Sequence, residues 1–239
     1  MPHSTPRKSP HIDFGPARWV RTLVALMVLG ALSWGGWEFQ RRLDGQWTGP
    51  GDWWGIRATK SNYSDDVLKW AEAYDLPYPY LMALIQLESG GRKPAGKRFE
   101  PHVFEQLKAV RDGRRLAYEN VTAVHLADAS DEALSNLATS WGPFQLMGYK
   151  CILLEVQIRD IRGNEAIRFG TDWINQTYGS HLKRAAYQDA FHLHNTGKPF
   201  PKSGKPQTYH PDYVARGLHL MNRYSSEPPS EEKDPTIPS

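Results

Sequence analysis

The chain of 239 residues has little cysteine and no net charge over most of its length, and each absence excludes a class of protein. A single cysteine, Cys151, excludes an intramolecular disulfide framework and a zinc site built from several cysteines. Residues 1–21 carry four basic side chains and one acidic side chain, which accounts for the whole net charge of +3. Residues 22–239 then hold 25 basic and 25 acidic groups. A nucleic-acid-binding domain needs an excess of Lys and Arg, so we expect no nucleic-acid partner.

The longest apolar run lies near the N-terminus, where Thr22 to Trp37 contains no charged residue. With the residues just before it, this run reaches the 17–25 residues that a transmembrane helix needs. Basic residues are more numerous before it than just after it, which favours a cytoplasmic N-terminus. We therefore expect a cytoplasmic basic tail over 1–18 and a single-pass inner-membrane anchor over 19–38. A cleaved signal peptide and a buried core helix are the alternatives, and the anchor and the signal both place residues 40–239 in the periplasm or beyond.

The rest of the chain divides by composition into a linker, a body and a tail. Residues 39–60 are rich in Gly and Trp and predict a linker. Residues 61–224 show helical periodicity in several segments and no long alternation, which predicts a mainly α domain with little strand. Residues 225–239 are polar, acidic and rich in proline, which is typical of a disordered tail. The predicted helices of the body span about 64–74, 79–88, 104–111, 131–138, 149–161, 164–178, 181–192 and 211–224.

One of these helices ends with a glutamate on its apolar side. Leu81, Leu84 and Ile85 form an apolar stripe whose next position is Glu88. Burial and the negative end of the helix dipole both disfavour a charged carboxylate there, so the pKa of Glu88 should be raised. A raised pKa is what a general acid requires near neutral pH. The alternative is a helix-end glutamate that turns out to water.

Two later segments hold polar residues that could belong to the same site. In Ser140–Tyr149 a single glutamine, Gln145, interrupts an apolar run, and a buried glutamine is costly without partners. The alternative is a capped turn that leads into a core helix. Ala190–Gly197 contains two histidines and Asn195. No third ligand lies near the histidines, so we expect neither a metal nor a cofactor.

The order of these segments resembles the lysozyme-like enzymes that cleave peptidoglycan. The nearest resemblance is to soluble-type lytic transglycosylases and to the bacterial and phage N-acetylmuramidases, and it covers roughly residues 65–220. Four motifs carry it: Glu-Ser-Gly-Gly at 88–91, Ser-x-Gly-x-x-Gln-x-Met at 140–147, Asn-x-Gly at 195–197 and Tyr-Val at 213–214. The resemblance implies a lysozyme-like fold, an α+β arrangement with little β structure.

Site residues follow from the resemblance position by position. It implies that Glu88 is the catalytic acid, that Ser140 and Gln145 line the sugar site and orient that acid, and that Met147 forms a pocket wall. Asn195 and Tyr213 match further substrate-binding positions. The chain departs from the transglycosylase motif at His194, where the motif has Tyr, and the 51 residues between the glutamate and the serine are closer to the muramidase spacing.

The implied reaction is cleavage of the β-1,4 bond between N-acetylmuramic acid and N-acetylglucosamine in peptidoglycan glycan strands. The Asn195 and Tyr213 matches favour a lytic transglycosylase, in which one glutamate serves as acid and then as base. A hydrolytic muramidase, of a phage or of the host, would need a second carboxylate. Glu100, in a Phe-Glu-x-His-x-Phe stretch similar to one in the muramidases, is a better candidate for it than Glu105. A third reading is a non-catalytic peptidoglycan-binding component, with proteins of an envelope assembly as partners.

The insert between the first two motifs, about 92–139, is rich in cations. They could contact acidic peptide stems of the cell wall, or they could form an ordinary solvated face. The residues concerned are Arg92, Lys93, Lys97, Arg98, Arg111, Arg114 and Arg115.

Overall fold

The computed structural model describes residues 52–226. The predicted basic tail (1–18), the predicted anchor (19–38) and all but the first two residues of the predicted C-terminal tail lie outside this range. Within 52–226, no helix is both long enough and apolar enough to span a membrane. The predictions of an anchor and of an inner-membrane location therefore stay predictions.

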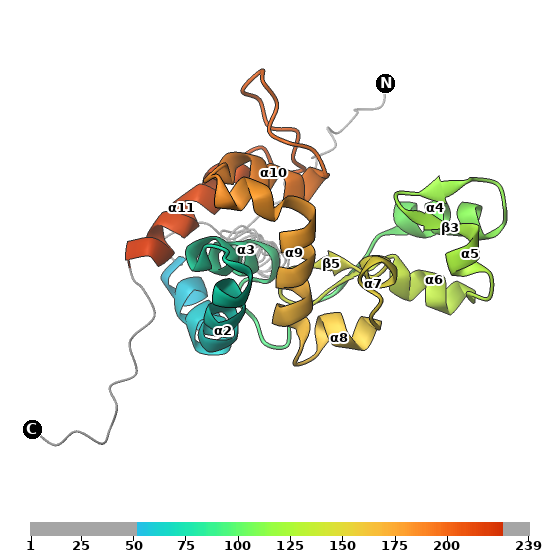
Figure 1. Ribbon diagram of the computed structural model, residues 1–239, viewed down its shortest axis with the longest axis horizontal. Helices are drawn as coiled ribbons and strands as arrows, with labels where there is room; N and C mark the ends of the chain where they lie inside the picture. The colour runs from blue at the N-terminus through green and yellow to red at the C-terminus, as the bar shows by residue number, and fades with distance from the viewer. Residues whose placement is uncertain (1–51, 227–239) are drawn as a thin grey trace, which may run out of the picture. The chain divides into compact units, whose positions relative to one another are not determined.

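Helices dominate the described residues and the strands are two or three residues long, which confirms a mainly α fold with little strand (Figure 1). The helices are α2 (Asp52–Tyr74), α3 (Tyr78–Ser89), α4 (Pro101–Arg111), α5 (Ala123–Leu126), α6 (Asp131–Leu137), α7 (Lys150–Leu154), α8 (Ile158–Arg162), α9 (Ala166–Lys183), α10 (Tyr187–Thr196) and α11 (Tyr213–Ser226). The strands are β1 (Arg98–Phe99), β2 (Ala117–Tyr118), β3 (Val121–Thr122), β4 (Thr139–Trp141) and β5 (Leu146–Met147).

Helix α3 lies at the centre of the larger of two hydrophobic clusters. It packs against α2 and α11, and almost all of its side chains are buried. A proline in its first turn suits the start of a helix, where the missing N–H costs no hydrogen bond. Gly90 ends it with a φ of 63°, in the left-handed region that glycine adopts without strain, and its N–H donates to the carbonyl of Gln86. The predicted helix over 79–88 is thus confirmed.

The predicted linker is wrong from residue 52 onward, because helix α2 already begins at Asp52. Ile56, Thr59, Tyr63 and Val67 recur at helical spacing and are all buried, so this stretch packs against the core like the rest of the helix. Glycine and tryptophan in the sequence concealed that periodicity.

Gly55 has a packing role in α2 and does not mark a linker. A Cβ atom there would lie 2.6 Å from the side-chain nitrogen of Gln86, so glycine lets α2 approach α3 closely. Ser64, where the predicted helix over 64–74 begins, lies in the middle of α2. Its hydroxyl is 2.6 Å from the hydroxyl of Tyr78, which joins the two helices.

Two other predicted helices are also divided differently. The stretch 149–161 forms α7 and α8, because Glu155 adopts a left-handed φ of 56° that ends α7. The predicted helix over 181–192 is split between the end of α9 and most of α10, with Ala185 at a φ of 56° between them. A positive φ is strained for a residue other than glycine, so neither a glutamate nor an alanine is expected to end a helix in this way. Hydrophobic periodicity therefore did not predict either break.

The segment 139–147 is a β-hairpin and does not lead directly into a core helix. Strands β1, β4 and β5 form an antiparallel sheet in which Ser140 pairs with both Arg98 and Met147. At Gly142, in the turn, φ is 73° and an added Cβ would lie 2.1 Å from the carbonyl oxygen of Ile161. The hairpin therefore requires glycine at this position.

A second, smaller hydrophobic cluster lies in the insert. It is formed by side chains of α4, α5, α6 and β3, among them Leu107, Val121, Leu126 and Leu134. Strands β2 and β3 pair as a two-stranded hairpin beside it. The insert is therefore folded around its own apolar residues.

Candidate active site

Glu88 lies at the end of α3, where side chains from two other helices reach its carboxylate. Its side chain is 17% exposed. The hydroxyl of Tyr213, the first residue of α11, donates a hydrogen bond to Oε1 of Glu88. The Nε2 atom of His194, on α10, lies 3.8 Å from the same oxygen. The structure thus gathers one carboxyl, one phenol and one imidazole from three separate helices.

Burial raises the pKa of Glu88 from its ordinary value of 4.5 to about 7. The hydrogen bond from Tyr213 and the positive charges of Arg98 and Arg216 act in the opposite direction, but the loss of hydration is larger. Glu88 therefore keeps its proton close to neutral pH, which the apolar stripe of its helix predicted. The alternative, a glutamate that turns out to water, is wrong.

His194 is held as a neutral ring beside this carboxyl. Its Nε2 lies 3.1 Å from the carbonyl oxygen of Phe144, and because a carbonyl only accepts, Nε2 carries the hydrogen. Its Nδ1 then accepts a hydrogen bond of 2.7 Å from the hydroxyl of Tyr178. Burial lowers the pKa of His194 to about 4, so the ring adds no positive charge that would lower the pKa of Glu88 at neutral pH.

Aromatic rings surround the imidazole and exclude water from it. The hydroxyl of Tyr80 donates to the hydroxyl of Tyr178 at 3.4 Å, which extends the chain of hydrogen bonds into the core. Trp173 makes edge contacts with both Tyr178 and His194, with ring centroids 5.8 Å apart in each pair. In the sequence, His194 stands out as a departure from the transglycosylase motif and as one of two histidines without a third metal ligand nearby. The sequence signal that could have identified it was its position beside the matched Asn195.

Ser140 and Gln145, two of the predicted substrate-binding residues, lie together on the β4–β5 hairpin. The Ser140 hydroxyl donates to Oε1 of Gln145 at 3.0 Å. The amide of Gln145 donates to the carbonyls of Gly96 and Gly142, at 2.8 and 2.9 Å. The hydrogen bond to Gly96 joins the hairpin to the segment that precedes Arg98. The positive charge of Arg98 lowers the pKa of Glu88. The residue that hydrogen bonds to the acid directly is Tyr213.

Two more of the five predicted substrate-binding residues, Asn195 and Met147, lie apart from these hydrogen bonds. Asn195 is exposed near the end of α10, one residue beyond His194. Met147, on β5, is half-buried and packs against the second hydrophobic cluster. The structure therefore brings Tyr213 to Glu88 and leaves the implied roles of Asn195 and Met147 as predictions.

Glu100, the candidate second carboxylate, lies close to two basic side chains. Its Oε1 lies 2.6 Å from Nε of Arg98, and its Oε2 lies 3.8 Å from Nδ1 of His102. It occupies the position just before α4, and its side chain is 19% exposed. Both oxygens of the Glu100 carboxylate therefore lie near basic groups.

The two histidines of α10 have separate hydrogen-bonding roles. His192 is fully buried, and its Nδ1 donates to the carbonyl of Lys198 at 2.7 Å. In the part of the chain that the structure describes, no three His, Cys, Asp or Glu side chains are grouped as metal ligands would be.

Comparison with known proteins gives a weak structural similarity. No family model matches the chain, and no curated protein sequence matches it. Among solved structures, the crystal structure of the Burkholderia AP3 phage endolysin is similar to it with a TM-score of 0.45 and 20% identity, over 68% of this chain and 71% of that chain.

The pKa of Glu88 should rise when the hydrogen bond from Tyr213 is removed. That bond stabilises the charged carboxylate, so Tyr213→Phe favours the protonated form. A hydrogen bond to a charged group contributes about 1.5 kcal/mol or more, which corresponds to a rise of about one pKa unit. The measurement is an NMR titration of the carboxyl carbons of labelled glutamate, with Tyr187→Phe as the control. A pKa for Glu88 that stays constant or falls in Tyr213→Phe would contradict this geometry.

Proposed function

We propose that this chain cleaves the β-1,4 bond between N-acetylmuramic acid and N-acetylglucosamine in peptidoglycan, as a lytic transglycosylase with Glu88 as its only acid and base. One observation carries the proposal: a carboxyl group that keeps its proton to about pH 7 and receives a hydrogen bond from Tyr213. The resemblance of the sequence motifs to lysozyme-like enzymes supplies the substrate class.

In the first step Glu88 gives its proton to the glycosidic oxygen as the bond to C1 of the muramic sugar breaks. The hydrogen bond from Tyr213 and the positive charges of Arg98 and Arg216 stabilise the carboxylate that this step creates. In the second step the Glu88 carboxylate takes a proton from the C6 hydroxyl of the same sugar, whose oxygen bonds to C1. The product is a 1,6-anhydro sugar, and Glu88 is protonated again.

The surroundings of Glu88 support this mechanism over hydrolysis. An inverting hydrolase needs a second carboxylate to activate water, and a retaining hydrolase needs one to attack the sugar. The charged groups that act most on Glu88 are two guanidinium groups, of Arg98 and Arg216. Glu100, the candidate for the second role, accepts an ion pair from Arg98 instead. A structural role for Glu100 fits a transglycosylase.

Replacement Glu100→Gln should therefore affect stability more than chemistry. The ion pair with Arg98 is partly exposed, so its loss should cost about 1 kcal/mol. Turnover on peptidoglycan should stay within a few-fold of wild type, as it should for the control Glu105→Gln on α4. The assay measures release of soluble fragments from purified peptidoglycan at temperatures well below the melting point. An inactive Glu100→Gln protein with an unchanged melting temperature would instead favour the muramidase.

We also infer, from the sequence alone, that residues 19–38 anchor the chain in the inner membrane with the catalytic domain in the periplasm. Alkaline phosphatase is active only after export, so a fusion placed after residue 51 reports on this directly. An inactive fusion would exclude both the anchor and the cleaved signal.

A further inference from the structure

A long loop, residues 197–212, connects the two helices that reach Glu88. It begins three residues after His194 and ends directly before Tyr213. Figure 1 shows it as the orange loop that leaves α10 and returns to α11. Loops of this length without helix or strand are uncommon within domains and are often functional. The chain connectivity places its ends next to the candidate acid.

Buried hydrogen bonds hold the base of this loop in one conformation. Nδ1 of His192 donates to the carbonyl of Lys198, and Nε2 of the same ring accepts from the backbone N–H of Gln207 at 3.0 Å, so one buried side chain joins both limbs. The N–H of Phe200 donates to Asp189 at 2.9 Å. A loop that is already ordered loses little conformational entropy when a ligand binds.

The tip of the loop is a tight turn. The N–H of Gly204 donates to the carbonyl of Pro201 at 3.0 Å, and Gly204 has a φ of 74° that favours glycine. The turn contains Lys202, and Lys205 directly follows it.

Three lysines on this loop are exposed and have no carboxylate partner within residues 52–226. They are Lys198, Lys202 and Lys205. The loop holds one acidic residue, Asp212, next to Tyr213. The loop, whose two ends adjoin the candidate site, therefore carries an excess of positive charge.

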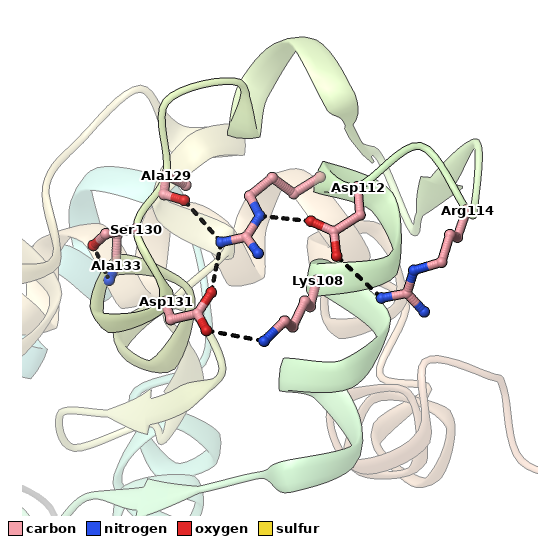
Figure 2. A network of polar contacts seen from close by, with 8 residues as sticks. Lys108, Asp112, Arg114, Ala129, Ser130, Asp131 and Ala133 are labelled. Carbon is pink, nitrogen blue, oxygen red and sulfur yellow. Dashed lines mark hydrogen bonds and ion pairs between the residues drawn. The ribbon is translucent and has the colours of Figure 1, made fainter.

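The cations of the insert do not offer a comparable surface, because they are engaged by neighbouring groups. Arg111 binds both Asp112 and Asp131, and Lys108 and Arg114 bind the other oxygens of the same two carboxylates, as Figure 2 shows for the side chains that it labels. The cations of residues 92–98 contact backbone carbonyls, carboxylates or the ring of Trp141. These contacts favour the lysines of the loop 197–212 over the cations of the insert as the groups that bind acidic peptide stems.

We propose that the loop 197–212 binds the carboxylates of the peptide stems attached to the glycan strand that lies at Glu88. This inference rests on the proposed function for its substrate. The sugars of that substrate carry neutral hydroxyl and amide groups, whereas the peptide stems carry its negative charges. Lys198, Lys202 and Lys205 thus give the site a preference for glycan that still bears its peptides.

The test compares two full-length proteins in mild detergent, both with Glu88→Gln so that binding is measured without cleavage. One also carries Lys198→Gln, Lys202→Gln and Lys205→Gln. Each is sedimented with native peptidoglycan sacculi and with sacculi whose carboxylates have been amidated with carbodiimide. At low salt the lysine variant should bind native sacculi about tenfold more weakly, as expected for three exposed charge pairs. Both proteins should bind amidated sacculi equally.

A control variant with Lys69→Gln, Lys183→Gln and Arg184→Gln removes the same charge from α2 and the end of α9, and it should bind native sacculi like the parent. Equal binding of native sacculi by the loop variant and the parent would overturn the proposal, as would a parent that binds neither kind of sacculus. Failure of the proposed function is a separate result. It would appear as absence of cleavage by the wild-type protein, whereas carboxylate-dependent binding through the three lysines would still support the loop.

Discussion

Replacement Glu88→Gln should abolish peptidoglycan cleavage while the fold stays intact. Glutamine has the shape of glutamate and can still accept the hydrogen bond from Tyr213, but it has no proton to donate to the leaving oxygen. Loss of general acid catalysis alone should lower turnover by about 10²–10⁴-fold. The loss should lie at or beyond the upper end of this range, because the same group acts as base in the second step.

Turnover is measured as soluble muropeptides released per enzyme per minute from purified sacculi. Glu72→Gln, an exposed position on α2, makes the same chemical change away from the site and should leave turnover unchanged. A Glu88→Gln protein that retains near wild-type turnover would remove Glu88 from the mechanism.

The same substitution should stabilise the protein at alkaline pH. Because the pKa of Glu88 is raised from 4.5 to about 7, its neutral form favours folding below pH 4.5, and this stability is lost as the pH rises through 7. A shift of this size corresponds to at most about 3 kcal/mol. Glutamine stays neutral at every pH, so Glu88→Gln should gain about 2–3 kcal/mol over wild type between pH 5 and pH 9.

Thermal unfolding of both proteins at several pH values measures this gain. For a domain of this size it corresponds to a difference in melting temperature of roughly 5–10 °C at pH 9. Other groups titrate equally in both proteins, so the difference between the two curves isolates Glu88. Curves that run parallel from pH 5 to pH 9 would mean that the Glu88 carboxyl is not held in its neutral form.

Local patterns in the sequence were enough to predict the helix that carries Glu88 and the side of that helix on which Glu88 lies. The stripe Leu81, Leu84, Ile85 fixed the side of the helix on which Glu88 lies, and the two glycines that follow fixed its end. These predictions concern a segment of fewer than about four helical turns. Hydrophobic periodicity is informative over a segment of that length.

Contacts between distant residues could not be predicted from periodicity. Tyr213 lies 125 residues from Glu88, and only the resemblance of its motif connected the two. The role of His194 depends on Tyr178 and on the carbonyl of Phe144, which meet it through tertiary packing alone. The start of α2 was missed because Gly55 looks like a linker residue until the side chain of Gln86 is seen beside it.

Analysis of the products released from peptidoglycan tests the central claim most directly. Purified sacculi are digested with the full-length protein, and the soluble fragments are examined by mass spectrometry. A lytic transglycosylase with Glu88 as its only acid and base should release fragments that end in 1,6-anhydro-N-acetylmuramic acid, one water lighter than the hydrolytic product. Fragments that end in reducing N-acetylmuramic acid would show that water attacks the sugar, and would contradict the mechanism proposed for Glu88.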